Sequence, residues 1–129
     1  MSKTLAIVFG IIFVLVGLLG FVSNPLVGAS ALFATNTLHD LVHLVIGLIL
    51  LGVAFWSPMQ SPLWLKIIGW VYLVIAILGF LLVSGTGDLL GLVTINAADD
   101  WLHIVLAVIL LVVGYQYSDS SAPMQPKAM

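Results

Sequence analysis

The sequence has no cysteine and no arginine among its 129 residues, and only 6% of its residues are charged. Without cysteine the chain forms no disulfide, no thiolate metal site and no cysteine nucleophile, and the redox compartment stays open. Three basic residues leave no cationic face that would neutralise phosphates. We therefore expect no nucleic acid partner.

Polar surface is scarce as well. Hydrophobic residues make up 63% of the chain, and the mean hydropathy is +1.31. A soluble globule of this length needs more polar surface than these residues supply. The lipid bilayer is therefore the expected surrounding of this protein.

Four apolar stretches reach the length of about 20 residues that a helix needs to cross a membrane. They cover residues 5–22, 38–56, 63–83 and 97–117, and none contains an internal proline. Helix is the expected conformation, because backbone groups inside lipid must be paired within their own segment. The predicted fold class is all-α, an integral membrane four-helix bundle in residues 1–117, followed by a short disordered tail at residues 118–129. A cleaved signal peptide at residues 1–31 is disfavoured, since its apolar run is too long.

The lysines predict how the chain is oriented. Lys3 precedes the first span, Lys66 begins the third and Lys127 follows the fourth, so all three lie on one side. The positive-inside rule makes that side cytoplasmic. We expect both termini in the cytoplasm and the two longer connections outside.

The sequence also matches itself at a shift of about 60 residues. Asn36, Asp40 and His43 then coincide with the second set, Asn96, Asp100 and His103. Polar residues are rare in membrane helices, so three that recur at identical spacing indicate duplication. We expect two tandem helical-hairpin repeats, residues 4–57 and 62–117, which run parallel and are related by a pseudo-two-fold axis along the membrane normal.

The repeated Asn and Asp residues are typical of helix starts. Asn36 and Asn96 precede apolar runs and are predicted N-caps. Asp99 follows its cap by three residues and is expected to complete a reciprocal cap. Asp40 and Asp100 suit the positive end of the helix dipole.

The two repeated histidines are harder to explain as structural residues. His43 and His103 lie about 10 Å along their helices, near the edge of the hydrocarbon layer. Each shares one helix face with an Asp three residues earlier and a small residue four residues later. The candidate polar or ligand site is therefore Asp40, His43, Asp100 and His103. His39, whose counterpart in the repeat is Asp99, is expected at the membrane interface.

Three functions fit this pattern. In the first, the polar stripe joins helices in an accessory or interaction protein, within a larger membrane complex or a homo-oligomer. His43 and His103 are also suitable ligands for a metal ion, a haem or a pigment. A small transporter or channel module is the third, and it would need to oligomerise. No nucleophile with its base and no phosphate-binding loop occurs, so enzymatic activity is not expected.

Three segments carry a resemblance to a known family: "NTLHDLVHLVIGLILLGVA", "WVYLVIAILGF" and "INAADDWLHIVLAVILLVVG". In this order they resemble the uncharacterised bacterial four-helix membrane family known as domain of unknown function 4383, over residues 5–117. The resemblance implies a bacterial inner-membrane protein without an established activity. The family often has Asn where Asp40 and Asp100 stand here, so His43 and His103 are the firmer members of the site.

Overall fold

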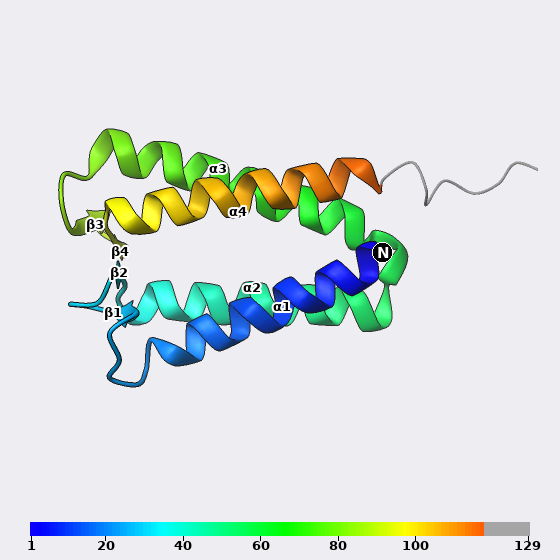
Figure 1. The fold of residues 1–129 in the computed structure, drawn as a ribbon, viewed down its shortest axis with the longest axis horizontal. Helices are drawn as coiled ribbons and strands as arrows, with labels where there is room; N and C mark the ends of the chain where they lie inside the picture. Colours follow the sequence, from blue (N-terminus) through cyan, green and yellow to red (C-terminus); the bar gives the residue numbers. More distant parts are fainter. Residues whose placement is uncertain (118–129) are drawn as a thin grey trace, which may run out of the picture.

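Four helices form the computed structural model, which describes residues 1–117 (Figure 1). They are α1 (Ser2–Leu19), α2 (Thr37–Trp56), α3 (Ser61–Leu82) and α4 (Ala97–Gln116), and a short 3₁₀ turn, η1 (Pro58–Gln60), links α2 to α3. All four helices are long and apolar enough to cross a membrane, so the predicted all-α fold class is confirmed. The predicted tail at residues 118–129 and Lys127 lie outside the described residues.

The first helix begins and ends three residues earlier than predicted. Its first turn takes in the polar residues Ser2, Lys3 and Thr4. At its other end the Asn24 side chain donates to the Leu19 carbonyl, with an N–O distance of 2.8 Å. This bond satisfies a terminal carbonyl, as helix ends require, and turns the chain away from the helix axis.

The helices form two antiparallel hairpins that lie side by side (Figure 1). In one hairpin α1 packs along α2, and in the other α3 packs along α4. Glycine allows the close approach, because a Cβ atom on Gly47 would lie 2.7 Å from the Gly10 carbonyl oxygen and the Val14 nitrogen. Small residues at helix contacts are typical of membrane bundles, where backbones pack closely. Phe13, Leu50, Tyr72 and Leu110 fill the core between the hairpins.

The two longer connections form short strands instead of open loops. In the first, β1 (Val27–Gly28) pairs in parallel with β2 (Phe33–Ala34). In the second, β3 (Gly87–Leu89) pairs antiparallel with β4 (Val93–Ile95) around Leu90 and Gly91, whose φ angles are both positive. All four strands lie at the end of the bundle where α2 and α4 begin (Figure 1).

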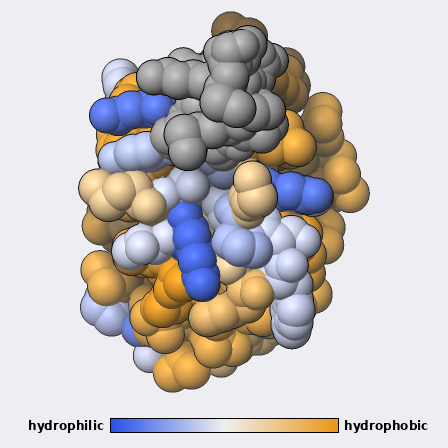
Figure 2. Space-filling view, turned by 90° about the vertical axis from the view of Figure 1, so that its right-hand side faces the viewer, coloured by the Kyte–Doolittle hydropathy of each residue, from blue (hydrophilic) through white to orange (hydrophobic). Residues whose placement is uncertain are grey.

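The opposite end of the bundle carries the N-terminus and η1. Figure 2 looks onto this end, where hydrophilic side chains gather while hydrophobic ones line the flanks. Lys66 lies here, with its Nζ atom 5.0 Å from the centroid of the Tyr115 ring. Apolar flanks between polar ends are the surface that a multi-pass membrane protein presents to lipid and water.

Candidate functional site

Two asparagines cap the N-termini of α2 and α4, at the end of the bundle where the strands lie. The Asn36 side-chain oxygen accepts from the His39 N–H at 2.9 Å, and that of Asn96 accepts from the Asp99 N–H at 3.0 Å. Their amide groups donate across the hairpins, from Asn36 to the Leu92 carbonyl and from Asn96 to the Leu32 carbonyl, each at 2.9 Å. Each asparagine therefore starts its own helix and binds the connection of the other hairpin.

Substitution of Asn36 separates these two roles. Asn36→Asp keeps an oxygen for the N-cap but loses the amide donor to Leu92. We expect hydrogen exchange to leave the His39 amide protected in Asn36→Asp and to speed up in the β3–β4 connection. In Asn36→Ala both should exchange faster, since loss of an N-cap costs about 1 kcal/mol. Equal loss of His39 protection in both variants would contradict this division.

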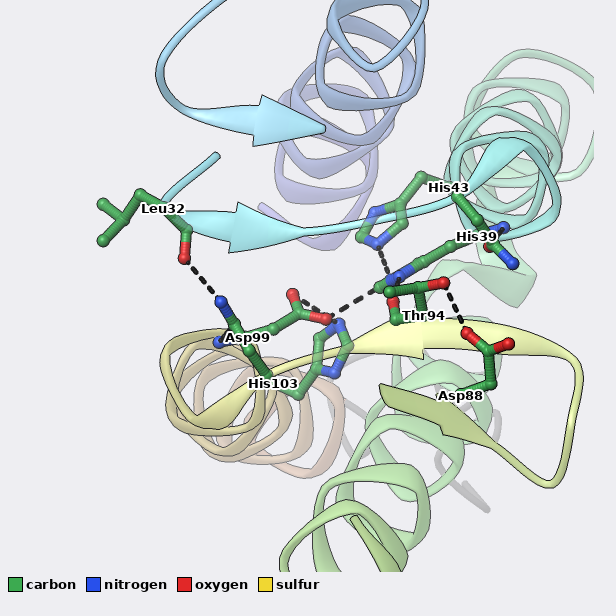
Figure 3. Close-up of polar contacts among 9 residues, drawn as sticks. Leu32, His39, His43, Asp88, Thr94, Asp99 and His103 are labelled. Carbon is green, nitrogen blue, oxygen red and sulfur yellow. Dashed lines mark hydrogen bonds and ion pairs between the residues drawn. The ribbon is translucent and has the colours of Figure 1, made fainter. Parts of the chain in front are cut away.

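Below the asparagines three histidines form one buried cluster (Figure 3). His39 and His43 come from α2 and His103 from α4, and each is at most 4% exposed. One ring nitrogen of each lies within 4.8 Å of the others. The Nε2 atoms of His39 and His43 are 3.0 Å apart. The cluster thus joins the two hairpins in the interior of the bundle.

The β4 strand fixes the orientation of His39. Its Nδ1 atom lies 2.7 Å from the Thr94 carbonyl oxygen, which only accepts, so Nδ1 carries a proton and donates it. The Thr94 hydroxyl in turn donates to Asp88 across the β3–β4 pair at 2.6 Å. In the neutral ring His39 Nε2 then carries the lone pair, which accepts a hydrogen bond from His43 Nε2 at 3.0 Å. This is how proteins commonly orient a metal-binding histidine.

Asp99 completes the cluster from α4. Its two carboxyl oxygens lie 3.7 Å from the Nε2 atoms of His39 and His103, and its side chain is about as buried as theirs. At that distance neither contact is a hydrogen bond. Among the described residues, several buried polar atoms here have no hydrogen-bond partner: Asp99 Oδ2, His43 Nδ1, both ring nitrogens of His103 and the Tyr72 hydroxyl.

Aromatic rings close the cluster on the side of the core. Tyr72 lies edge-on to His103 with ring centroids 4.9 Å apart, and Phe13 lies 5.7 Å from His43. Phe13 and Tyr72 stack on each other at 5.3 Å. These rings separate the polar atoms from the rest of the bundle.

The predicted site residues divide into two groups. His43 and His103 lie in the cluster, with ring centroids 5.9 Å apart. The carboxyl groups of Asp40 and Asp100 instead lie against glycines of their own hairpins, Gly20 for Asp40 and Gly79 for Asp100. No hydrogen bond or ion pair within residues 1–117 joins either of them to a histidine.

Two residues of the cluster were not predicted as site residues. His39 was expected at the interface, and this is wrong, since it is 4% exposed. Asp99 was expected to cap α4, whereas its carboxyl group lies beside His39 and His103. The sequence contained a signal for both residues, because His39 and Asp99 each precede a predicted site histidine by four residues. Residues four apart share a helix face.

Comparison with known proteins gives one match. No curated protein and no solved structure matches the chain. The profile of a family described as "Domain of unknown function (DUF4383)" matches residues 3–116, which is most of the sequence. The chain therefore belongs to the DUF4383 family.

Proposed function

We propose that this protein is a metal-binding accessory protein of the membrane, in which His39, His43, His103 and Asp99 hold one divalent transition-metal ion. The observation that carries the proposal is the 2.7 Å bond from His39 Nδ1 to the Thr94 carbonyl. It leaves the Nε2 lone pair of a fixed ring directed at the other ligands, which is the arrangement that metal-binding histidines adopt.

The donor set suits such an ion in kind and in spacing. Three imidazole nitrogens and one carboxyl oxygen are ligands that Zn²⁺ and other first-row ions accept. In a tetrahedral Zn²⁺ site with bonds near 2.1 Å, ligand atoms lie about 3.4 Å apart. The histidine nitrogens lie between 3.0 and 4.8 Å apart, and the Asp99 oxygens lie 3.7 Å from the Nε2 atoms of His39 and His103. Side-chain rotations would bring these donors to one centre.

The burial of these side chains also supports a bound metal ion. Unpaired polar atoms in a protein interior are costly and call for an explanation, such as a bound ion. Asp99 and both repeated histidines carry such atoms, although each is at most 4% exposed. A divalent cation would bind one nitrogen of each histidine and one oxygen of Asp99, and it would offset the carboxyl charge.

A haem or pigment fits less well than an ion. The cavities beside the cluster have volumes of about 150 and 120 Å³. Pockets that enclose drug-sized ligands measure about 300 Å³ or more. Tyr72 and His39 also pack against His103, with ring centroids 4.9 and 5.6 Å away, where a macrocycle would have to lie.

The proposed role is to join the two hairpins. Two of the donors come from α2 and two from α4, whereas direct helix contacts between the hairpins are sparse compared with those inside each hairpin. A metal bound only by the folded protein would strengthen this junction through its binding free energy. We place the protein in the bacterial inner membrane, as the family resemblance implies. The lysines and the parallel repeat predict cytoplasmic termini and a metal near the outer leaflet.

The test is a Co²⁺ titration of the purified, chelator-treated protein in detergent. We expect one Co²⁺ per chain, visible absorption bands typical of a four-coordinate ion, and displacement by Zn²⁺. At a free metal concentration 100 times the Kd, the free energy of unfolding should rise by about 2.7 kcal/mol. A His43→Gln, His103→Gln double variant is the control, and binding by the wild type that does not exceed it would refute the proposal.

A further inference from the structure

Two apolar clefts lead from the surface of the bundle to the histidine cluster. One lies between α1 and α4, has a volume of about 150 Å³, and ends at His43 and Asp99. The other lies between α2 and α3, has a volume of about 120 Å³, and ends at His39, His103 and Tyr72. Both are partly open at the flanks that face lipid in a membrane-spanning bundle.

The clefts are built from equivalent positions of the two hairpins. Val16, Phe33 and Leu102 line the first cleft, and their counterparts at a shift of 59 or 60 residues line the second. Those counterparts are Ile75, Val93 and Val42. Protein interiors contain few such spaces, so one that recurs at equivalent positions is a feature of the architecture and not a packing defect.

The polar ends of the clefts differ. Thr35 and Asp99 line the first, Ile95 and His39 line the second at the corresponding positions, and Tyr72 lines only the second. Tyr72 is 2% exposed, and its hydroxyl has no hydrogen-bond partner in the part of the chain that the structure describes. Its equivalent position on α1 is Phe13, which has no hydroxyl. A buried tyrosine hydroxyl usually has a partner. The α2–α3 cleft therefore offers a donor at the end of an apolar passage.

The size of the α2–α3 cleft and the position of its entrance restrict which ligands reach the Tyr72 hydroxyl. An enclosed apolar cavity of about 150 Å³ holds a benzene ring. The α2–α3 cleft is smaller, about 120 Å³, but it is partly open, so a six-membered ring fits with its outer edge at the opening. Val42 and Val71 form part of the rim of the α2–α3 cleft and are 37% and 44% exposed, so the entrance faces the bilayer and not water. The suitable ligand is a single six-membered ring that dissolves in lipid and carries an oxygen acceptor.

We infer that the α2–α3 cleft binds a lipid-soluble benzoquinone-type ring, whose carbonyl oxygen accepts a hydrogen bond from the Tyr72 hydroxyl. The ring contacts Ile75 and Val42, and its tail remains in the bilayer. This binding goes beyond the proposed metal site and does not depend on it, because the tyrosine donor and the apolar walls need no metal.

The test uses a benzoquinone with a decyl tail and the full chain in lipid nanodiscs, both metal-free and loaded with Zn²⁺. We expect saturable quinone binding above that of empty nanodiscs in both forms, and an infrared carbonyl band lowered in frequency by the hydrogen bond. Tyr72→Phe should weaken binding about three- to tenfold, the value of one lost hydrogen bond, and abolish the band shift. Ile75→Phe fills the cleft and should weaken binding more.

Two matched variants control for nonspecific effects. Val16→Phe makes the same change in the α1–α4 cleft, and Val74→Phe makes it at the neighbouring residue of α3, which is 51% exposed. Both should bind quinone as the wild type does. Absence of saturable binding, an unchanged carbonyl band in Tyr72→Phe, or an equal loss in Val16→Phe would overturn the inference. Quinone binding is measured on metal-free protein as well, so it tests this inference even if the protein binds no metal.

Discussion

The His39→Gln variant is expected to bind Co²⁺ and Zn²⁺ at least about 100-fold more weakly than the wild type. Loss of a group that merely orients a ligand costs about 10- to 100-fold in metal affinity, and loss of a ligand costs more. Gln keeps a polar side chain of similar length but has no imidazole lone pair. Competition with a chromophoric chelator measures the affinity, and the absorption of bound Co²⁺ reports the change in its ligands.

The control for His39→Gln is Ser61→Ala. Ser61 is fully buried and its hydroxyl has no partner within residues 1–117, but it is the first residue of α3, at the opposite end of the bundle. Its removal should leave metal affinity within about twofold of the wild type, because only ligands and their partners set that affinity. A comparable loss in both variants would mean that His39→Gln acts through general destabilisation.

An exchange of residues sharpens this prediction. His39 and Asp99 hold equivalent positions in the two proposed repeats, so His39→Asp combined with Asp99→His preserves three histidines and one carboxyl group. We expect the double variant to recover affinity to within about tenfold of the wild type, whereas each single variant stays weak. The remaining deficit is the lost bond to Thr94, which orients His39 alone. No recovery would count against a shared centre.

Asp99→Asn is expected to move stability and metal affinity in opposite directions. The metal-free variant should be more stable than the wild type by about 1 kcal/mol, because Asp99 is 2% exposed and its Oδ2 atom has no hydrogen-bond partner among the described residues. Its affinity for Zn²⁺ should fall about 10- to 100-fold, since a neutral amide is a poorer ligand than a carboxyl group. Unfolding in denaturant, with and without Zn²⁺, measures both effects on one preparation.

The matched change for Asp99→Asn is Asp100→Asn. Asp100 is equally buried at 2% exposure and also has an oxygen without a partner among residues 1–117, but its carboxyl group lies against Gly79 and has no hydrogen bond or ion pair with a histidine there. We expect it to leave Zn²⁺ affinity unchanged. If Asp100→Asn reduced affinity as much as Asp99→Asn does, the carboxyl donor would be wrongly assigned.

A metal shared by the two hairpins would have a physical role in a membrane bundle. Membrane helices gain little from burying apolar side chains against each other, since lipid is equally apolar. Association between α1–α2 and α3–α4 then depends on packing and polar contacts. The asparagine bonds to Leu32 and Leu92 and a metal shared by α2 and α4 would both act at the end of the bundle where the strands lie.

The sequence alone determined the fold class, and it determined the ends of the four helices to within three residues. Span length and apolar composition are local properties, and the membrane thickness converts them directly into helix ends. The sequence also predicted His43 and His103 as candidates, because a repeated polar residue inside an apolar run is rare whatever surrounds it.

Only the tertiary structure decided which neighbours accompany those histidines. Adjacent residues on a helix point about 100° apart, so Asp99 and Asp100, one position apart, face different partners. The rotation of each helix is fixed by packing: Gly20 and Gly79 receive Asp40 and Asp100, which leaves His39 and Asp99 directed at the cluster. The Thr94 bond to His39 joins residues 55 positions apart and depends on how the β3–β4 connection folds over α2. Such contacts arise from the packing of whole elements, and spacing along the chain does not specify them.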